Sequence, residues 1–185
     1  LAVRCPPEIM VHPLPRKMAM ESLSEVKANV FAFGPGIGSS PDDAYLDWLQ
    51  AETRPIVVDA DGLNLMARHP DKRLAMVQAG PRVVTPHPGE FARLFPEEAT
   101  LTTRCERVEA VVQAFPLTLL YKGENTLIAH DGGPTYRNTT GNPGMATGGM
   151  GDVLTGIIAA LLAQGYEPMH AASLGAWLAG RAADH

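Results

Sequence analysis

A glycine-rich segment near the C-terminal end constrains this chain more than any other feature. Residues 141–152 read Gly-Asn-Pro-Gly-Met-Ala-Thr-Gly-Gly-Met-Gly-Asp, and the apolar stretch Val153 to Ala163 follows directly. A glycine loop that opens a helix presents free backbone N–H groups and the positive end of the helix dipole at one point, which favours an anionic phosphoryl group. Asp152 lies beside this predicted anion site. A carboxylate at this position can act as a base that accepts a proton from an attacking hydroxyl.

A simpler interpretation is that the segment is only a turn with a helix cap. Aspartate is a favoured N-cap residue, and glycine is common in turns that precede helices. A cap needs a single such residue, however, and does not account for five glycines within twelve positions. Each glycine raises the entropy cost of ordering the loop. We therefore predict a phosphate site in this segment.

The composition limits the class of protein. With 185 residues, 45% hydrophobic and 19% charged, the chain fits one globular domain. The net charge of −5 and the lack of a strongly basic run argue against nucleic acid or an anionic membrane as the main partner. The apolar run after Asp152 is shorter than the roughly 20 residues that cross a bilayer, which indicates a buried helix. Cys5 and Cys105 lack the spacing of a metal or redox site and are expected to be free thiols in a reducing cytoplasm.

The two ends of the chain suggest a fragment. Leu1 is not a start methionine, and no signal-peptide pattern follows it, so we expect the chain to begin inside a longer protein. The proline-rich opening is expected to be irregular. A last amphipathic helix is predicted from Ser173 to Asp184, without a stop signal after it.

Short β-rich runs alternate with helical stretches in the middle of the chain. This alternation predicts a parallel sheet covered by helices, and the continuous apolar character of the runs indicates burial on both faces. A later β-hairpin, with its turn at Asp131-Gly132, predicts that the sheet is mixed at that end. The predicted parallel strands are 29–33, 55–59, 82–85 and 117–122, and those of the hairpin are 125–129 and 135–138.

Polar or glycine-rich residues follow each predicted parallel strand. In open α/β sheets a ligand binds just beyond the carboxyl ends of the strands, so we expect these residues to share one edge. They are Gly34, Gly36 and Gly38 after the first strand, Asp59 and Asp61 after the second, His87 and Glu90 after the third, and Lys122 after the fourth.

Several of these residues have a simpler interpretation that the sequence leaves open. The three glycines fit a tight turn into a helix beginning near Asp42 about as well as a close approach to a ligand. Asp59 and Asp61, with Asn64 nearby, suggest a magnesium site or a contact to sugar hydroxyl groups. We nevertheless expect Asp61 to cap a helix that starts at Gly62.

His87 and Lys122 are candidate ligand contacts. His87 lies between two prolines, which hold an imidazole rigid, and we favour a ligand contact for it. Glu90 either contacts the ligand or favours the N-terminus of a helix. Lys122 can pair with nucleotide phosphates, although a surface lysine that keeps its ammonium in water is the simpler explanation.

Five segments together resemble the ADP/ATP-dependent NAD(P)H-hydrate dehydratases, a branch of the ribokinase-like fold. The resemblance covers most of the chain from about Phe31 onward, and Thr140 to Gly156 is its most specific part. It implies a single α/β domain, residues 1–185, with three αβα layers and a mostly parallel central sheet, incomplete at both ends. The segments are 33–38, 57–64, 84–91, 121–126 and 138–165.

The resemblance implies repair of a hydrated nicotinamide cofactor. In that reaction a nucleotide, typically ADP in bacteria and otherwise ATP, phosphorylates the ring hydroxyl of the S-epimer of NAD(P)HX in the presence of Mg²⁺. Loss of phosphate then restores NAD(P)H, with AMP as the other product. The implied partners are NAD(P)HX, the adenine nucleotide, further copies of the chain and an NAD(P)HX epimerase, fused or separate, in the cytoplasm.

The resemblance also implies roles for individual residues. The contacts to the hydrated cofactor are Gly38, His87 and Asp152, and Asp152 is also the catalytic residue. The adenine-nucleotide positions are Lys122, Gly123, Glu124, Asn125, Thr126 and Gly151, and the anion loop is Gly148, Gly149, Met150 and Gly151. No metal ligand is assigned. Two features depart from the family: it more often has a small polar residue at position 150, and it has a further N-terminal glycine-rich βαβ segment before Leu1.

Two other functions stay open on the sequence alone. A ribokinase-like small-molecule kinase would stop at the phosphate ester, but Thr85 to Glu90 and Asn142 to Gly144 resemble the dehydratases more than those kinases. A non-catalytic nucleotide-binding module has only Met150 and the missing ends in its favour.

Overall fold

One six-stranded sheet organises the chain. The structure, a computed structural model, describes residue 23 and residues 25–38 and 43–185, so the proline-rich opening, Cys5 and Asp42 lie outside the described residues. The strands are ordered β1-β2-β3-β4-β5-β6, with β1 to β4 parallel and the last two antiparallel, which confirms the predicted mixed sheet. Their bounds are β1 Phe31–Phe33, β2 Ile56–Val58, β3 Arg82–Val84, β4 Thr118–Tyr121, β5 Leu127–His130 and β6 Tyr136–Arg137.

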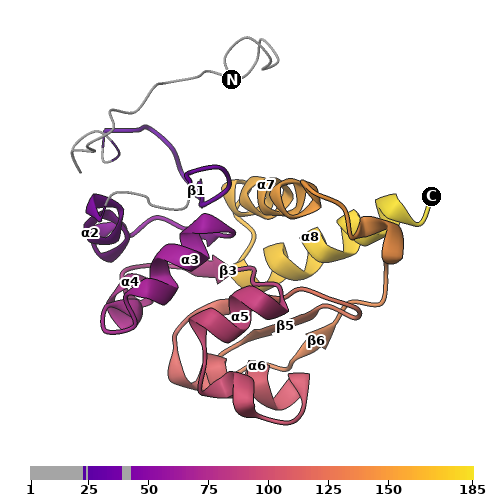
Figure 1. Ribbon diagram of the computed structural model, residues 1–185. Coiled ribbons are helices and arrows are strands. Elements are labelled where there is room, and N and C mark those ends of the chain that lie inside the picture. The colour runs from indigo at the N-terminus through magenta and orange to yellow at the C-terminus, as the bar shows by residue number, and fades with distance from the viewer. Residues whose placement is uncertain (1–22, 24, 39–42) are drawn as a thin grey trace.

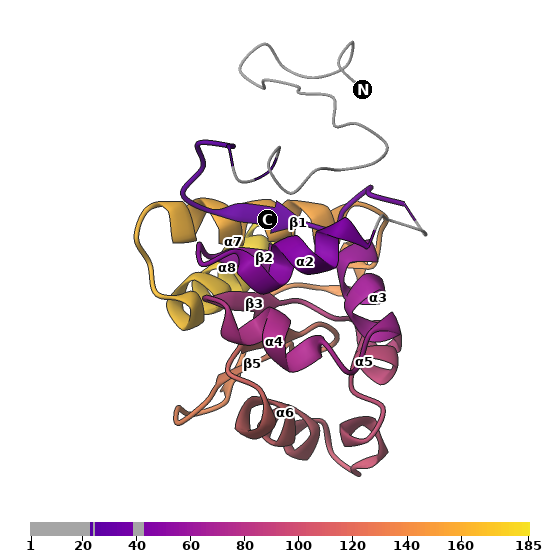
Figure 2. The ribbon, with the colours of Figure 1, turned by 90° about the vertical axis from the view of Figure 1, so that its left-hand side faces the viewer.

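Helices cover both faces of this sheet (Figures 1 and 2). The helices that connect β1 to β4 fall on one face, because right-handed crossovers between strands added in one direction always pass the same side. They are α2 (Ala44–Ala51), α3 (Asp61–Arg68), α4 (Arg73–Gln78), α5 (Pro88–Leu94) and α6 (Arg104–Ala114), with the short η2 (Glu98–Thr100) before α6. The other face is covered by α7 (Met150–Ala163) and α8 (Pro168–Ala183), which follow the short η3 (Pro143–Met145).

The buried strand residues divide between two hydrophobic layers. Alternate side chains of a strand point to opposite faces. Ile56 and Val58 therefore pack with the layer of α2 to α6, while Val57 between them packs with α7 and α8. Val84 and Val83 alternate in the same way. The continuous apolar runs in the sequence thus reflect two covered faces, and the predicted three-layer αβα architecture is confirmed.

The C-terminal helices differ from their predicted bounds. α7 begins at Met150 rather than Val153, and α8 begins at Pro168 rather than Ser173. Thr155 and Ile158 of α7 are buried, but Val153 is 54% exposed. The prediction of a buried helix is therefore wrong for one side of α7, because only one stripe of it contacts the sheet and α8. None of the helices in the described residues is long and apolar enough to cross a membrane, and Cys105 is an exposed free thiol as predicted.

An ion pair between Glu52 and Arg54 secures the segment that leads into β1. Nε and Nη2 of Arg54 donate to the Glu52 carboxylate at 2.7 and 2.6 Å, and Nη1 donates to the carbonyl groups of Val26 and Ala28 at 2.8 and 3.1 Å. Hydrogen bonding from Arg54 lowers the pKa of Glu52 from 4.5 to about 2. The same guanidinium lies 4.5 Å from the ring centroid of Phe31 in β1.

The lowered pKa of Glu52 makes the stability of the protein depend on pH. Between pH 4.5 and about 2 the unfolded chain binds more protons at Glu52 than the folded chain, so the free energy of unfolding rises with pH in this window. The stabilisation is complete above that window and is lost as the pH falls through it. Glu52→Gln should lower stability at pH 7 and reduce the further loss on acidification, as measured by urea unfolding at pH 3 and pH 7. The exposed Glu109→Gln is the control, and an acid loss in Glu52→Gln equal to that of wild type would contradict the prediction.

Candidate active site

A buried ion pair lies at the carboxyl ends of the parallel strands. Asp59 follows β2 and is 2% exposed. Its carboxylate accepts hydrogen bonds from Lys122 Nζ at 2.7 Å, Thr155 Oγ1 at 2.9 Å and the N–H of Ala60 at 2.9 Å. The Glu90 carboxylate lies 3.8 Å from Lys122 Nζ. Because its charge is paired with Asp59, Lys122 belongs to an internal network, and the interpretation as a simple surface lysine is wrong.

Helix α7 reaches this network through its first residues. A Cβ atom on Gly151 would lie 3.3 Å from Asp59 Oδ2 and 3.4 Å from Lys122 Nζ, so a side chain there would press on the ion pair. Thr155, one turn further along α7, donates to the same carboxylate. The ion pair thus positions the N-terminal end of α7 against the sheet.

The glycine loop leaves its backbone open at the start of α7. Gly149 has a φ of 92°, a left-handed conformation that suits glycine, and a Cβ atom on it or on Gly148 would meet nothing within 4 Å. In the described part of the chain, the N–H groups of Gly151 and Asp152 donate no hydrogen bond, whereas that of Met150 donates to Thr147 at 3.4 Å. Free N–H groups at a helix N-terminus are suited to a phosphoryl group.

Asp152 lies in the first turn of α7 rather than at its cap. The N-cap is Gly149, and no side chain caps this helix, so the interpretation of Asp152 as a cap is wrong. Asp152 is exposed beside the open backbone. Met150 lines an apolar hollow of about 640 Å³ between α7 and α8, together with Val153 and Leu178. The side chain of Met150 therefore lies in this hollow and not among the loop amides.

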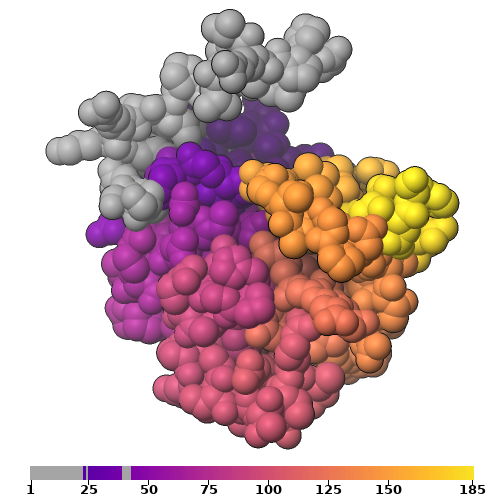
Figure 3. All heavy atoms as spheres, turned by 45° about the vertical axis from the view of Figure 1, so that its right-hand side comes forward, coloured from indigo at the N-terminus to yellow at the C-terminus, as the bar shows by residue number. Residues whose placement is uncertain are grey.

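The other end of the glycine loop is anchored to the C-terminal end of α8. The N–H of Gly141 donates to Asp184 at 3.0 Å, and Asn142 Nδ2 donates to the carbonyl of Ala183 at 2.6 Å. Asn142 Oδ1 also accepts from the N–H of Gly144 at 2.9 Å. In Figure 3 the orange segment with this loop adjoins the yellow end of α8. The loop therefore runs between two fixed points, α8 and the ion pair.

His87 is the N-cap of α5. Its Nδ1 accepts from the N–H groups of Gly89 and Glu90 at 3.0 and 3.3 Å, and the Glu90 carboxylate accepts from the N–H of His87 at 2.8 Å. This capping box confirms that Glu90 supports the start of the helix. A neutral imidazole that accepts at Nδ1 carries its proton on Nε2. The side chain of His87 is 51% exposed, and its Nε2 lies 3.5 Å from the Glu90 carboxylate.

The glycines after β1 have different surroundings. A Cβ atom on Gly34 would lie 1.8 Å from the carbonyl oxygen of Asp59, so this position has no room for a side chain. Gly36 and Gly38 border open space. Gly34 therefore serves close packing of β1 on the end of β2, and a ligand contact for Gly38 stays a prediction.

Asp61 does not cap a helix. α3 begins at Asp61 itself, and its N-cap is Ala60, which has a φ of 50°. The Asp61 carboxylate instead accepts from the N–H of Gly38 at 3.1 Å and from Asn64 Nδ2 at 3.4 Å. Asp59 and Asp61 therefore have separate partners. Among the residues described, no group of three or more His, Cys, Asp or Glu side chains could hold a metal ion.

Two residues that sequence analysis did not single out complete the site. Thr155 donates to Asp59. The sequence indicated its position only through its spacing of four residues from Gly151, which places both residues on one face of a helix. Arg104, at the start of α6, donates to the carbonyl groups of Lys122 and Glu124 in the loop after β4. The sequence near Arg104 carries no indication of this contact, which depends on packing between segments.

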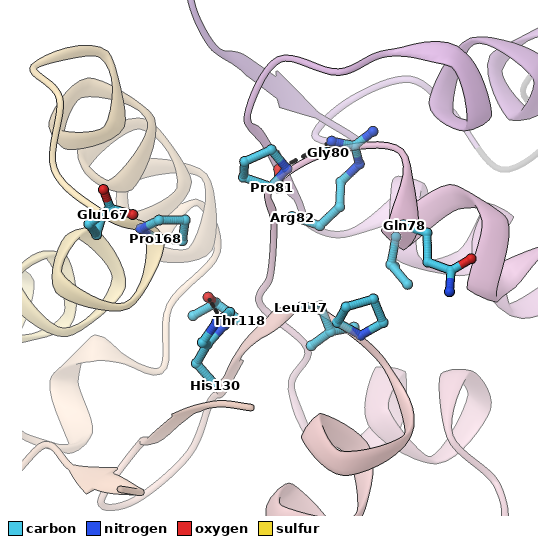
Figure 4. Close-up of a pocket in the computed structure, with 11 residues that line it drawn as sticks. Gln78, Gly80, Pro81, Arg82, Leu117, Thr118, His130, Glu167 and Pro168 are labelled. Atoms are coloured by element: carbon cyan, nitrogen blue, oxygen red, sulfur yellow. Dashed lines mark hydrogen bonds between the residues drawn. The ribbon is translucent and has the colours of Figure 1, made fainter. Parts of the chain in front are cut away.

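A second hollow lies at the opposite edge of the sheet, where β3 and β4 begin. It measures about 500 Å³, and Figure 4 shows His130 and Thr118 side by side within it. Their Nδ1 and Oγ1 atoms are 3.1 Å apart. Arg82 is turned away and donates to the carbonyl of Pro81 at 3.2 Å. No predicted site residue lines this hollow.

The protein is an α/β protein of the ribokinase-like fold, as shown by its three layers, its strand order and the loop that opens α7. The family model described as NAD(P)H-hydrate dehydratase matches residues 3–185, and the chain belongs to this family.

Curated relatives and a solved structure agree with this assignment. The chain is 47% identical to a bifunctional NAD(P)H-hydrate repair enzyme of Moorella thermoacetica, over 89% of this chain and 31% of the relative. It is 37% identical to an ADP-dependent (S)-NAD(P)H-hydrate dehydratase of Neisseria meningitidis, over 96% of this chain and 60% of the relative. A Bacillus subtilis ADP/ATP-dependent NAD(P)H-hydrate dehydratase, co-crystallised with ATP/Mg²⁺ and soaked with CoA, is 31% identical, with a TM-score of 0.73 over 86% of this chain and 58% of that one. The chain thus spans about a third to three fifths of these relatives.

The hydroxyl of Thr155 provides a test of the network. Thr155→Val removes one hydrogen bond from the buried Asp59 carboxylate and should destabilise the protein by about 1–3 kcal/mol, the usual cost of an unsatisfied buried group. Thr155→Ser keeps the hydroxyl and should lose clearly less. Urea unfolding of the two variants measures the difference, and equal losses would show that the hydroxyl does not support Asp59.

Proposed function

We propose that the full-length protein restores NAD(P)H from the S-epimer of NAD(P)HX while converting ADP to AMP and phosphate. One observation carries the proposal: Asp152 and the open amides of α7 share a strand edge with Lys122 and His87, in a chain of the NAD(P)H-hydrate dehydratase family. The name of the Neisseria relative supports both ADP and the S-epimer.

In the first step the ring hydroxyl attacks the terminal phosphorus of the nucleotide. The new oxygen–phosphorus bond forms as the bond to the bridging oxygen breaks, and AMP leaves. A carboxylate is too weak a base to remove an alcohol proton beforehand, but in a loose transition state the proton departs late. Asp152 orients the hydroxyl and accepts this proton. The amides of Gly148 to Gly151 stabilise the charge that develops on the phosphoryl oxygens.

Loss of phosphate completes the dehydration. The lone pair of the ring nitrogen expels phosphate from the adjacent carbon, and loss of a proton from the next carbon restores the ring double bond. Phosphate is a better leaving group than hydroxide, which is the purpose of the first step. A small-molecule kinase would retain the phosphate ester instead.

The proposal assigns ligand contacts at the two sides of this edge. NAD(P)HX contacts Gly38, His87 and Asp152. Because the described residues form no cage of carboxylates, Mg²⁺ would be held mainly by the nucleotide phosphates, whose charge it neutralises. The nucleotide contacts Lys122, Gly123, Glu124, Asn125, Thr126 and Gly151.

We further propose partners for the whole protein. The bifunctional name of the Moorella relative supports an NAD(P)HX epimerase as a fused or separate partner. The family resemblance supports a homo-oligomer in the cytoplasm.

The proposal is tested by the absorbance of the reduced nicotinamide. The full-length protein is incubated with hydrated NADH or NADPH, Mg²⁺ and ADP, ATP or no nucleotide. Recovery of absorbance with ADP supports the proposal, and recovery with ATP alone changes the donor. Accumulation of a stable phosphate ester would indicate a kinase, and nucleotide binding without any product would indicate a binding module.

Asp152→Asn should separate chemistry from binding. The variant keeps the size of the side chain but accepts no proton, so turnover should fall by about 100-fold or more, as when a general base is lost. Nucleotide affinity, measured by calorimetry, should stay close to wild type. Asp131→Asn, an exposed change in the hairpin turn, is the control. Turnover of Asp152→Asn close to that of the control would exclude the assigned role.

A further inference from the structure

Arg104 is placed at the side of the proposed nucleotide loop by the start of α6. Thr103 is the N-cap: its Oγ1 accepts from the N–H of Glu106 at 3.1 Å, and the Glu106 carboxylate accepts from the N–H of Thr103 at 2.8 Å. This capping box fixes the first turn of α6. The guanidinium of Arg104 therefore leaves a rigid position and reaches the chain that follows β4.

One guanidinium binds four carbonyl groups, three in the 122–126 loop and one on Tyr121 at the end of β4. Nη2 of Arg104 donates to the carbonyls of Tyr121 and Lys122 at 2.9 and 3.1 Å. Nη1 donates to the carbonyls of Glu124 and Asn125 at 2.5 and 3.5 Å. The group also lies over the ring of Tyr121, 4.5 Å from its centroid. A planar fork of donors is required for this set of contacts, which a lysine ammonium does not provide.

The loop backbone has two residues with positive φ values beside Arg104. Gly123 and Asn125 have φ values of 141° and 53°, in the region that glycine and asparagine tolerate best. A Cβ atom on Gly123 would lie 3.1 Å from Arg104 Nη2, so the glycine also gives the guanidinium room. The other two loop carbonyls have other partners: that of Gly123 accepts from Thr126 Oγ1 at 3.1 Å, and that of Thr126 accepts from the N–H of Asn138 at 2.8 Å.

This arrangement leaves the opposite side of the loop available. In the part of the chain that the structure describes, the N–H groups of Gly123, Glu124 and Asn125 donate no hydrogen bond. Gly123 and Glu124 are exposed. Arg104 holds the carbonyls of Lys122 and Glu124. A trans peptide group directs its N–H away from its own carbonyl, so the N–H groups of Gly123 and Asn125 point away from Arg104.

We propose that Arg104 is a positioning residue that orders the 122–126 loop before the adenine nucleotide binds. The inference rests on the proposed function, which assigns this loop to the nucleotide. The guanidinium of Arg104 donates its hydrogen bonds to the loop carbonyls, so it affects nucleotide binding by fixing the loop and not by contacting the nucleotide. A loop that is ordered in advance does not lose its conformational freedom on binding, so the benefit falls on nucleotide affinity and not on the chemical step.

The test compares Arg104→Met, Arg104→Lys and Arg107→Met in the full-length protein. Arg107 is the matched control, because it lies in the same helix and donates from Nε to the Leu101 carbonyl outside the loop. Arg104→Met should raise the KM for ADP by about tenfold or more, since the loop must then be ordered on binding. The KM for hydrated NADH and kcat at saturating ADP should stay within about twofold of wild type. Arg104→Lys should restore only part of the affinity, and Arg107→Met should change neither KM.

Amide hydrogen exchange without nucleotide gives a second readout. In Arg104→Met the amides of residues 123–126 should exchange at least about tenfold faster, with the rest of the sheet unchanged. Unchanged loop exchange, or an equal rise of both KM values, would overturn the inference. If the wild type lacks ADP-dependent turnover, the proposed function fails and the exchange comparison still decides the role of Arg104. Arg104→Lys serves for both readouts should the methionine variant not fold.

Discussion

The ion pair between Asp59 and Lys122 is the interaction on which the candidate site depends. It joins the ends of β2 and β4 across β3. Thr155 of α7 donates to the same carboxylate and so links the helices on the other face of the sheet to the pair. A buried carboxylate without its partners carries a large desolvation cost, so these residues hold one another in place. Gly151 completes the arrangement, because a Cβ atom there would lie only 3.3 Å from the Asp59 carboxylate and 3.4 Å from Lys122 Nζ.

Around this fixed point, the site combines rigid supports with open donors. Asn142 and Asp184 hold one end of the glycine loop, and Arg104 holds the loop after β4. Both loops present backbone N–H groups that have no acceptor among the described residues. Phosphoryl transfer depends on donors that are aligned before charge develops, because donors that must reorganise at that moment stabilise the charge less. This architecture therefore suits the proposed reaction.

Much of the fold was predictable, because it depends on local patterns. Alternating apolar runs and helical stretches predicted the parallel sheet, the hairpin and the common edge at which the candidate site residues lie. The helix starts were less predictable. Asp61 and Asp152 were interpreted as possible caps, but both are helical, and the turns before them are made by Ala60 and Gly149 in unusual backbone conformations. Such conformations are set by packing between segments, so residue preference alone misplaces the boundary.

The sequence by itself determined the layers, the strand edge and the family, since periodicity, turn residues and the Gly141 to Asp152 motif are all local. Only the tertiary structure decided what these residues contact. It paired Lys122 with Asp59, turned His87 Nδ1 to the helix start, and brought Arg104 to the loop after β4. These contacts join residues from different elements, and the geometry between elements arises from packing of the whole core, which no local pattern encodes.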